Sequence, residues 1–151
     1  MSAATQNARI LPIAKEHVEG FHRCLDSVAR ERLYLALVQA PLLDSTRGFV
    51  LSNIANDVPQ FVAVIDNEVV GWCDICPMKR EGFTHCGELG MGVHVRYRRC
   101  GIGQQLVVRT IQKAKEKGCV AELRELDEER NRRNSARPKE RWIRMFRTAD
   151  F

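Results

Sequence analysis

The sequence predicts a mixed α/β domain in which a mostly antiparallel sheet is flanked by helices. Two amphipathic helical patterns come first, a series of short β-rich runs follows from residue 60 to residue 95, and a further helical pattern comes after it. The chain has 151 residues, which is enough to bury one hydrophobic core of its own. We therefore expect one domain.

The N-terminal part is predicted to form a short strand and a helix. Residues 9–13 are β-prone, and Pro12 restricts this strand to an edge of the sheet. A helix is expected from Lys15 and is predicted to end between Arg30 and Leu33, although the helical spacing can be followed to Leu37. Its expected inward face consists of Val18, Phe21, Leu25, Val28 and Ala29.

A second helix is predicted after Pro41, which interrupts the first pattern. Asp44 or Ser45 is the expected N-cap, and the helix should continue to Asn56. The apolar residues expected to face inward are Phe49, Val50, Leu51 and Ile54.

Three β-rich runs follow, and their spacing predicts an antiparallel meander. Residues 60–65 and 69–75 surround the polar turn at 66–68, which is a typical hairpin pattern. The third run begins near Thr84 and leads into residues 89–95. We expect the following helix to pack back onto this sheet.

The segment from residue 87 to residue 117 combines a strand, a glycine-rich turn and a helix. Apolar residues alternate with other residues from Leu89 to Val95, which predicts a strand with one buried face. The turn is Arg98–Gly103, and helical spacing then continues until Gly118. Unpaired amides at a helix N-terminus, approached closely through glycines, can bind a phosphate group.

Two common nucleotide-binding patterns do not fit this turn. A P-loop requires Lys-Ser or Lys-Thr after its last glycine, and neither follows Gly103; a dinucleotide fingerprint requires a third glycine where Leu106 stands. The turn does match Arg/Gln-x-x-Gly-x-Gly at residues 98–103. Together with the strand before it and the helix after it, this pattern resembles the acetyl-coenzyme A site of the GNAT N-acetyltransferase superfamily.

The resemblance covers residues 8–118 and implies direct transfer of acetyl from acetyl-CoA to a primary amine of a small molecule or amino acid. It implies that the strand offers its main chain to pantetheine at Val93, His94 and Val95, where amides would also polarise the thioester carbonyl. The turn would receive the pyrophosphate, with added attraction from its two arginines. The positions concerned are Arg98, Arg99, Cys100, Gly101, Ile102, Gly103 and Gln104.

The resemblance also implies a general base. Glu88 stands where many family members keep a carboxylate that accepts the ammonium proton; the alternative is a solvated glutamate at a strand end. The family's general acid, a tyrosine on a late helix, has no equivalent, since Tyr34 and Tyr97 are the only tyrosines. A catalytically idle acyl-CoA-binding domain is therefore an alternative function.

Residues 119–151 depart from the family pattern, so we expect a core at residues 1–118 and a divergent segment of the same domain after it. Residues 130–147 are rich in arginine, Pro138 interrupts them, and neither a fifth strand nor a late tyrosine is visible. A spacing of three favours a short helix at Val120, Leu123 and Leu126. The tail is either translated out of frame or a divergent solvated helix, and sequencing the coding DNA distinguishes the two.

Composition narrows the remaining functions. The net charge is +5, but acidic residues interleave with the arginines of the tail, so nucleic-acid binding ranks below acetyl transfer. Cys73 and Cys76, with His85 and Cys86, could suggest zinc, yet strand alternation turns Cys73 and Cys76 to opposite faces and we predict no metal.

Six cysteines and the lack of a signal peptide or membrane helix predict a cytoplasmic protein. An exposed edge on the strand before the turn would favour a homodimer.

Overall fold

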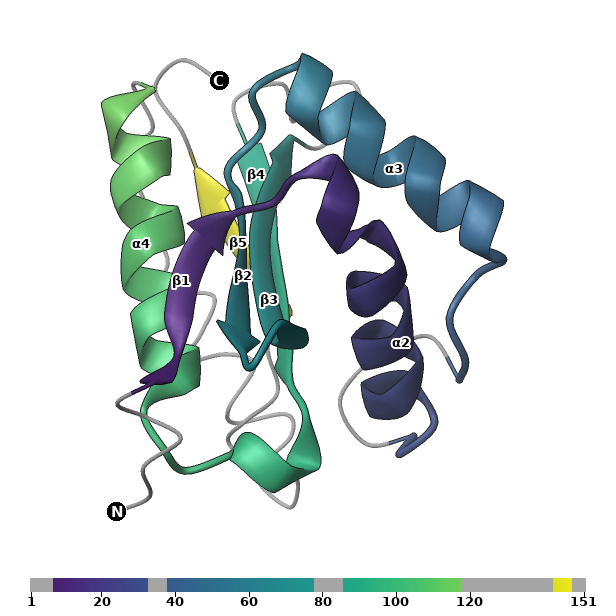
Figure 1. Cartoon of the computed structure of the whole chain (residues 1–151). Helices are drawn as coiled ribbons and strands as arrows, with labels where there is room; N and C mark the ends of the chain where they lie inside the picture. The colour runs from purple at the N-terminus through teal and green to yellow at the C-terminus, as the bar shows by residue number, and fades with distance from the viewer. Residues whose placement is uncertain (1–6, 33–37, 78–85, 118–142, 148–151) are drawn as a thin grey trace.

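The computed structural model describes residues 7–32, 38–77, 86–117 and 143–147 of the chain (Figure 1). In chain order its elements are β1 (Arg9–Pro12), η1 (Lys15–His17), α2 (Val18–Ala29), α3 (Leu43–Ala55), β2 (Gln60–Ile65), β3 (Glu68–Pro77), β4 (Cys86–Val93), η2 (Val95–Tyr97), α4 (Ile102–Glu116) and β5 (Ile143–Arg147).

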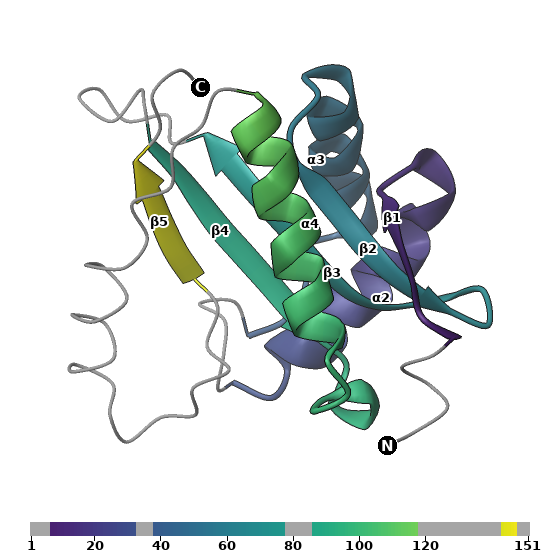
Figure 2. The same cartoon turned by 90° about the vertical axis from the view of Figure 1, so that its left-hand side faces the viewer.

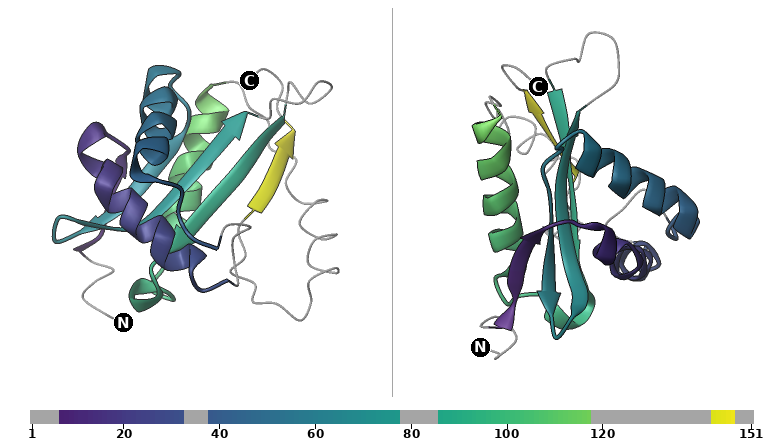
Figure 3. Two further views of the ribbon diagram at one scale, coloured as in Figure 1. Left: turned by 90° about the vertical axis from the view of Figure 1, so that its right-hand side faces the viewer. Right: turned by 45° about the horizontal axis from the view of Figure 1, so that its top comes forward.

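The strands form one antiparallel sheet in the order β1-β2-β3-β4-β5, and helices cover both faces. Figures 1 and 2 show α4 crossing one face, and Figure 3 shows α2 and α3 on the opposite face. One buried apolar cluster lies between the sheet and α4, and a second lies between the sheet and α2. The predicted fold class, a mostly antiparallel sheet flanked by helices, is confirmed.

The β2–β3 hairpin forms as the sequence predicts. Ile65 pairs with Glu68, so the connection consists of Asp66 and Asn67. Both of these residues have positive φ angles, 49° and 66°, which is the backbone geometry of a type I′ turn. Asp and Asn tolerate this conformation better than most residues, which is why the short polar turn could be identified from the sequence.

Of the inward face predicted for the second helix, Val50 is buried as expected, but Phe49, Leu51 and Ile54 are exposed. In α3, Phe49 is 41% exposed and Ile54 is 41% exposed, whereas Thr46 and Asn53 are buried together with Val50. The N-cap position is Leu42 and not Asp44 or Ser45, and no side chain caps the helix. Apolar residues lie all around α3, so the sequence pattern could not show which side of the helix faces the sheet. In the structure, the buried side chain of Asn53 donates a hydrogen bond to Gln60 at the start of β2.

The end of β4 and the tail also differ from the sequence expectation. β4 ends at Val93, and Val95 lies in η2 with 56% of its surface exposed, because the chain leaves the sheet at His94. A fifth strand does exist: β5 pairs antiparallel with Cys86–Gly90 of β4. Its pairing partner lies far away in the sequence, which a local pattern cannot show. The expected helix at residues 120–126, Tyr34 and His85 lie outside the described residues.

Gly92 is required by the packing of Trp72, and this gives a stability prediction. A Cβ on Gly92 would lie 2.4 Å from the ring of Trp72, which is 3% exposed and packs edge-on to Phe21 with ring centroids 5.6 Å apart. We expect Gly92→Ala to lower the free energy of unfolding by about 1–3 kcal/mol in urea denaturation. Gly90→Ala is the matched control on the same strand face, because its Cβ would make only an ordinary 3.5 Å contact. Equal effects of the two variants would contradict this explanation.

Candidate active site

A cleft of about 500 Å³ opens where the end of β4, the following turn, the first turns of α4 and the C-terminal part of α2 meet. The cleft therefore joins a strand edge, a glycine-containing helix start and an apolar wall. Its lining residues are Val28, Met91, Gly92, Val93, Tyr97, Arg98, Arg99, Gly101, Gly103, Gln104, Val107 and Val108.

The strand edge of the cleft offers main-chain groups. The amide of His94 donates to the carbonyl of Val70 on β3 at 2.8 Å. Because neighbouring residues of an antiparallel strand turn their main chain to opposite sides, Met91 and Val93 direct theirs away from β3. The pairing with β5 ends at Gly90, so among the described residues no strand pairs with Met91–Val93 on that side. The His94 amide, which the sequence analysis assigned to pantetheine, is thus already used within the sheet.

The start of α4 supplies the helix end of the cleft. Gly101 is the N-cap residue and has a φ angle of 82°, a conformation that favours glycine. The first backbone bond of the helix runs from the Gln105 amide to the Gly101 carbonyl at 3.2 Å. The amides of Ile102, Gly103 and Gln104 precede that bond and have no intrahelical partner, which is the usual arrangement for anion binding.

Gly103 brings the helix close to the strand edge. A Cβ on this residue would lie 3.1 Å from the Cε atom of Met91. A side chain at this position would therefore occupy the space between α4 and β4. Because Gly103 has no side chain, the phosphate site that the sequence predicts stays open between α4 and β4.

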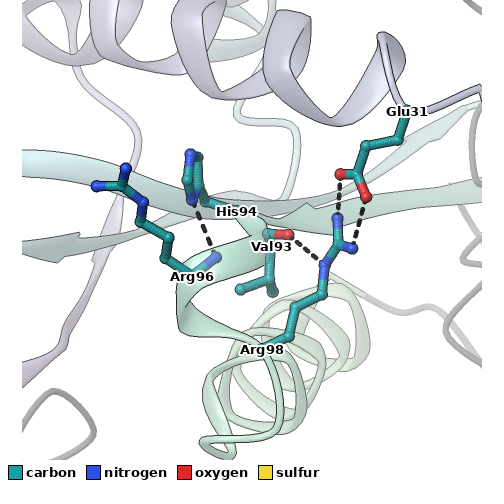
Figure 4. Close-up of polar contacts among 5 residues, drawn as sticks. All are labelled: Glu31, Val93, His94, Arg96 and Arg98. Atoms are coloured by element: carbon teal, nitrogen blue, oxygen red, sulfur yellow. Dashed lines mark hydrogen bonds and ion pairs between the residues drawn. The ribbon is translucent and has the colours of Figure 1, made fainter.

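The Arg98 guanidinium is held between Glu31 and the end of β4. Its Nη1 and Nη2 atoms donate to the Glu31 carboxylate at 2.8 and 2.5 Å, and its Nε donates to the Val93 carbonyl at 2.8 Å (Figure 4). Both side chains are mostly buried, with 18% and 23% exposed. This clamp ties the segment after α2 to the end of β4 and occupies the outward carbonyl of Val93. Glu31 could not be found from the sequence, because no local pattern links residue 31 to residue 98.

The clamp predicts strong energetic coupling between its two side chains. In a double-mutant cycle with Glu31→Gln and Arg98→Gln, we expect a coupling free energy of about 1–3 kcal/mol, since each single change leaves a largely buried charge without its partner. The exposed pair Arg30 and Asp26, with 61% and 30% of the side chains exposed, is the control and should couple by less than about 0.5 kcal/mol. Similar coupling in both pairs, measured by urea denaturation, would show that the clamp is an ordinary surface pair.

The other face of β4 carries two carboxylates. Glu88 is exposed and lies opposite Cys76 of β3, while Asp74 is buried and lies opposite Gly90. Burial raises the pKa of Asp74 to about 7, with a further contribution from the charge of Glu88, and a hydrogen bond from Cys76 acts in the opposite direction. Sequence analysis did not identify Asp74; its signal is a single acidic residue within the apolar run of β3.

The thiols of Cys24, Cys73 and Cys76 are poor nucleophiles. Burial raises the pKa of Cys24 to about 12 and raises the pKa of Cys73 and Cys76 well above the ordinary thiol value. Cys73 packs in the cluster beneath α4, whereas the Cys76 Sγ contacts Asp74 on the other face. The predicted placement of these two cysteines on opposite faces is confirmed. The described residues contain no group of three or more His, Cys, Asp and Glu side chains suited to a metal, and none of their helices could span a membrane.

The structure separates the residues predicted for the site into two groups. Six of them line the cleft: Val93, Arg98, Arg99, Gly101, Gly103 and Gln104. Ile102 and Cys100 pack against the apolar cluster under α4, and the His94 ring accepts a hydrogen bond from the Arg96 amide. Val95 is exposed in η2, and Glu88 lies on the α2 and α3 face of the sheet outside the cleft lining. Tyr97, which the sequence analysis set aside, does line the cleft.

Comparisons with solved structures identify the fold. An N-acetyltransferase from Staphylococcus aureus Mu50 is 18% identical, with 95% of this chain and 98% of that chain covered and a TM-score of 0.69. The ribosomal-protein-alanine N-acetyltransferase from Brucella melitensis is 18% identical, with coverages of 93% and 97% and a TM-score of 0.67. The yncA protein from Salmonella typhimurium, solved with its cofactor acetyl-CoA, is 14% identical, with coverages of 94% and 92% and a TM-score of 0.69.

A comparison with curated protein sequences finds no match. The model of the acetyltransferase (GNAT) family, in contrast, matches residues 21–138. This match extends past Gly118, where the sequence analysis ended the resemblance. Because it covers most of the chain, and because the fold and the cleft agree with it, the protein belongs to the acetyltransferase (GNAT) family.

Proposed function

We propose that this protein transfers the acetyl group of acetyl-CoA to a primary amine of a small molecule or amino acid. The observation that carries the proposal is the cleft itself, which joins the outer edge of β4 to the N-terminus of α4. These two features suit two adjoining parts of coenzyme A: the extended pantetheine arm and the anionic pyrophosphate. The absence of a side chain at Gly103 leaves room for such a ligand between helix and strand.

The residues of the cleft have separate roles in this proposal. The amides at the start of α4, from Gly101 to Gln104, receive the pyrophosphate, and Arg99 adds positive charge. Main-chain groups of Met91 and Val93 bind pantetheine as an added strand. The Val93 amide is the proposed donor to the thioester oxygen, because the His94 amide is bonded to Val70. Arg98 supports this edge through Val93 and does not contact phosphate directly, since Glu31 neutralises it.

The acceptor amine is proposed to approach from the face of α2 and α3. Glu88 lies exposed on that face and is the proposed carboxylate that attracts the ammonium group and accepts its proton, directly or through water. The neutral amine then attacks the thioester carbonyl without an acyl-enzyme. Deprotonation is required because an ammonium nitrogen has no lone pair for the attack.

The remaining parts of the chain are assigned as follows. Residues 1–118 form the proposed acetyl-CoA-binding core, and residues 119–151 form a divergent segment of the same domain, consistent with the pairing of β5 to β4. A reducing compartment such as the cytoplasm suits the free thiols of Cys24, Cys73, Cys76 and Cys100. A homodimer through the edge of β4 is less favoured than the sequence predicts, because β5 pairs with Cys86–Gly90 of that edge.

Isothermal titration with acetyl-CoA, followed by thiol release in the presence of small primary amines, tests the proposal. We expect binding and amine-dependent release of CoA. Binding without release on any amine would instead indicate the catalytically idle acyl-CoA-binding domain. A folded chain that binds neither acetyl-CoA nor CoA would contradict the proposed function.

A further inference from the structure

Asp74 lies on the acceptor face directly behind the strand edge of the cleft. It pairs with Gly90 of β4, and its Oδ1 atom is 3.5 Å from the position that a Cβ on Gly90 would take. The Trp72 ring covers Gly92 on the same face, two pairs further along the two strands. Since both β4 residues lack side chains, the Asp74 carboxylate and the Trp72 ring lie over the backbone on either side of Met91.

The surroundings of Asp74 are polar and almost closed. The residue is 8% exposed, and the Cys76 Sγ lies 3.5 Å from Oδ1. On β2, Gln60 pairs with Asp74; its Oε1 accepts from Asn53 of α3 at 2.9 Å, while its buried Nε2 has no hydrogen-bond partner among the described residues. A buried donor without a partner beside a buried carboxylate marks a place where a polar group of a ligand can bind.

No basic side chain in the part of the chain that the structure describes forms an ion pair with Asp74. The groups around it are Cys76 on its own strand, Glu88 on β4, whose charge acts on it, and Gln60 on β2, which pairs with it and is bonded to Asn53 of α3. Burial and the negative charge of Glu88 both disfavour the charged carboxylate, which raises the pKa of Asp74 to about 7. A carboxyl group in this state exchanges a proton near neutral pH, as a general base requires.

We propose that Asp74 is the inner proton acceptor for the attacking amine, and that Glu88 is the outer carboxylate that draws the ammonium group in and returns the proton to solvent. This inference rests on the proposed acetyl transfer, because it assumes a thioester at the Met91–Val93 edge. It divides between two neighbouring carboxylates the task that the sequence assigned to Glu88 alone.

The proposed proton path balances as follows. The ammonium group gives one proton to the Asp74 carboxylate, which becomes a neutral carboxylic acid. The nitrogen lone pair forms the C–N bond at the thioester carbon, and the C–S bond breaks with its electron pair on sulfur. The thiolate takes the second proton from the nitrogen, which yields the amide and the free thiol of CoA. Asp74 then releases its proton to solvent through Glu88 and regains its charge.

The experiment compares Asp74→Asn, Glu88→Gln and the control Asp66→Asn, whose side chain lies exposed in the β2–β3 turn. Acetyl-CoA affinity is measured by titration, and kcat and kcat/KM are measured from pH 5 to pH 9 with the best amine found for the parent. We expect Asp74→Asn to lower kcat by about 100-fold or more and to leave the acetyl-CoA Kd within about twofold. We expect the rise of kcat/KM near pH 7 to disappear in this variant.

Glu88→Gln should move the same rise to lower pH, because loss of the Glu88 charge removes one cause of the raised pKa of Asp74. Gly90→Ala tests the role of Asp74 as proton acceptor without altering Asp74 itself. It therefore provides a test even if the Asp74→Asn variant does not fold. Its methyl group would stand 3.5 Å from the Asp74 Oδ1, on the face from which the amine is proposed to approach, so it should hinder the amine from reaching Asp74 and lower kcat while the Kd stays unchanged.

The outcomes separate the inference from the proposed function. Unchanged kcat and an unchanged pH profile in folded Asp74→Asn would overturn the role of Asp74 while leaving acetyl transfer intact. The same holds if Asp74→Asn does not fold and Gly90→Ala keeps the parent kcat. A parent chain without acetyl-CoA binding or turnover would overturn the proposed function, and the inference with it.

Discussion

Gly103→Asp is expected to weaken acetyl-CoA binding by at least about 100-fold while leaving the fold intact. The new carboxylate would stand at the first turn of α4, inside the space between the helix and Met91, where a Cβ already reaches within 3.1 Å of the Met91 Cε. A negative charge there would repel the pyrophosphate at close range, and even a partly screened repulsion at about 4 Å is worth several kcal/mol. Binding measured by isothermal titration reports this loss directly.

The free protein should tolerate this substitution. An acidic side chain in the first turn of a helix interacts favourably with the helix dipole, so the free energy of unfolding should stay within about 1 kcal/mol of the parent. Gly48→Asp on α3 is the matched control, since its Cβ would meet no atom within 4 Å and it lies far from the cleft lining. Equal affinities in the two variants would mean that the cofactor does not bind at the start of α4. Adding Gly101→Asp should deepen the loss, with extra backbone strain at a φ angle of 82°.

Asp74→Asn is expected to stabilise the protein at alkaline pH, by as much as roughly 4 kcal/mol at pH 8. The pKa of Asp74 is raised from 3.8 to about 7 in the folded chain, so the folded state binds a proton more tightly than the unfolded state. The resulting stabilisation is complete below about pH 4, falls as the pH rises toward 7, and is absent above that value. Asparagine is never charged, so the variant avoids the cost of a buried carboxylate.

Urea denaturation at pH 5 and pH 8 measures this effect. The difference in unfolding free energy between the variant and the parent should be much larger at pH 8 than at pH 5. Asp44→Asn is the control for the loss of a carboxylate that is not buried, because 97% of the Asp44 side chain is exposed. A parent and an Asp74→Asn variant with the same pH dependence would show that Asp74 is not held in an unfavourable environment.

A gain of stability together with a loss of turnover in Asp74→Asn would have a clear meaning. Core positions are normally occupied by residues that stabilise the fold, whereas groups used in catalysis are often kept at a cost to stability. Asp74 is buried between β2 and β4 with no basic partner among the described residues. Higher stability together with lower turnover would show that the Asp74 carboxylate serves catalysis and not the stability of the fold.

The sequence was most informative where the chemistry is local. The turn from Arg98 to Gly103 carries its own signals, because the positive φ angle at Gly101 favours glycine and the small size of Gly103 leaves space between α4 and Met91. The β2–β3 hairpin was equally readable, since its two turn residues tolerate positive φ angles. These features depend on the backbone of a few consecutive residues, which is the scale that a sequence pattern describes.

Features made by distant contacts were not predictable. The bond between Glu31 and Arg98 joins residues 67 positions apart, and it is the reason that we propose support of Val93, and not contact with phosphate, as the role of Arg98. The pairing of β5 with β4 links residue 143 to residue 90. The rotation of α3 depends on Asn53 and its bond to Gln60, and not on the number of apolar residues around the helix. Burial of Asp74 likewise follows from packing, and this burial is the main cause of its raised pKa.

The most direct test of the proposed cofactor site is a titration of the ¹⁵N-labelled chain with acetyl-CoA, followed by amide chemical shifts. We predict that the largest shifts occur at Met91 and Val93 on the strand edge and at Gly103 and Gln104 at the start of α4. The amide of Gly48 on α3 should remain unchanged. Shifts concentrated on α3, or saturable binding that leaves the Met91–Gln104 segment unaffected, would contradict the assignment of this cleft to acetyl-CoA.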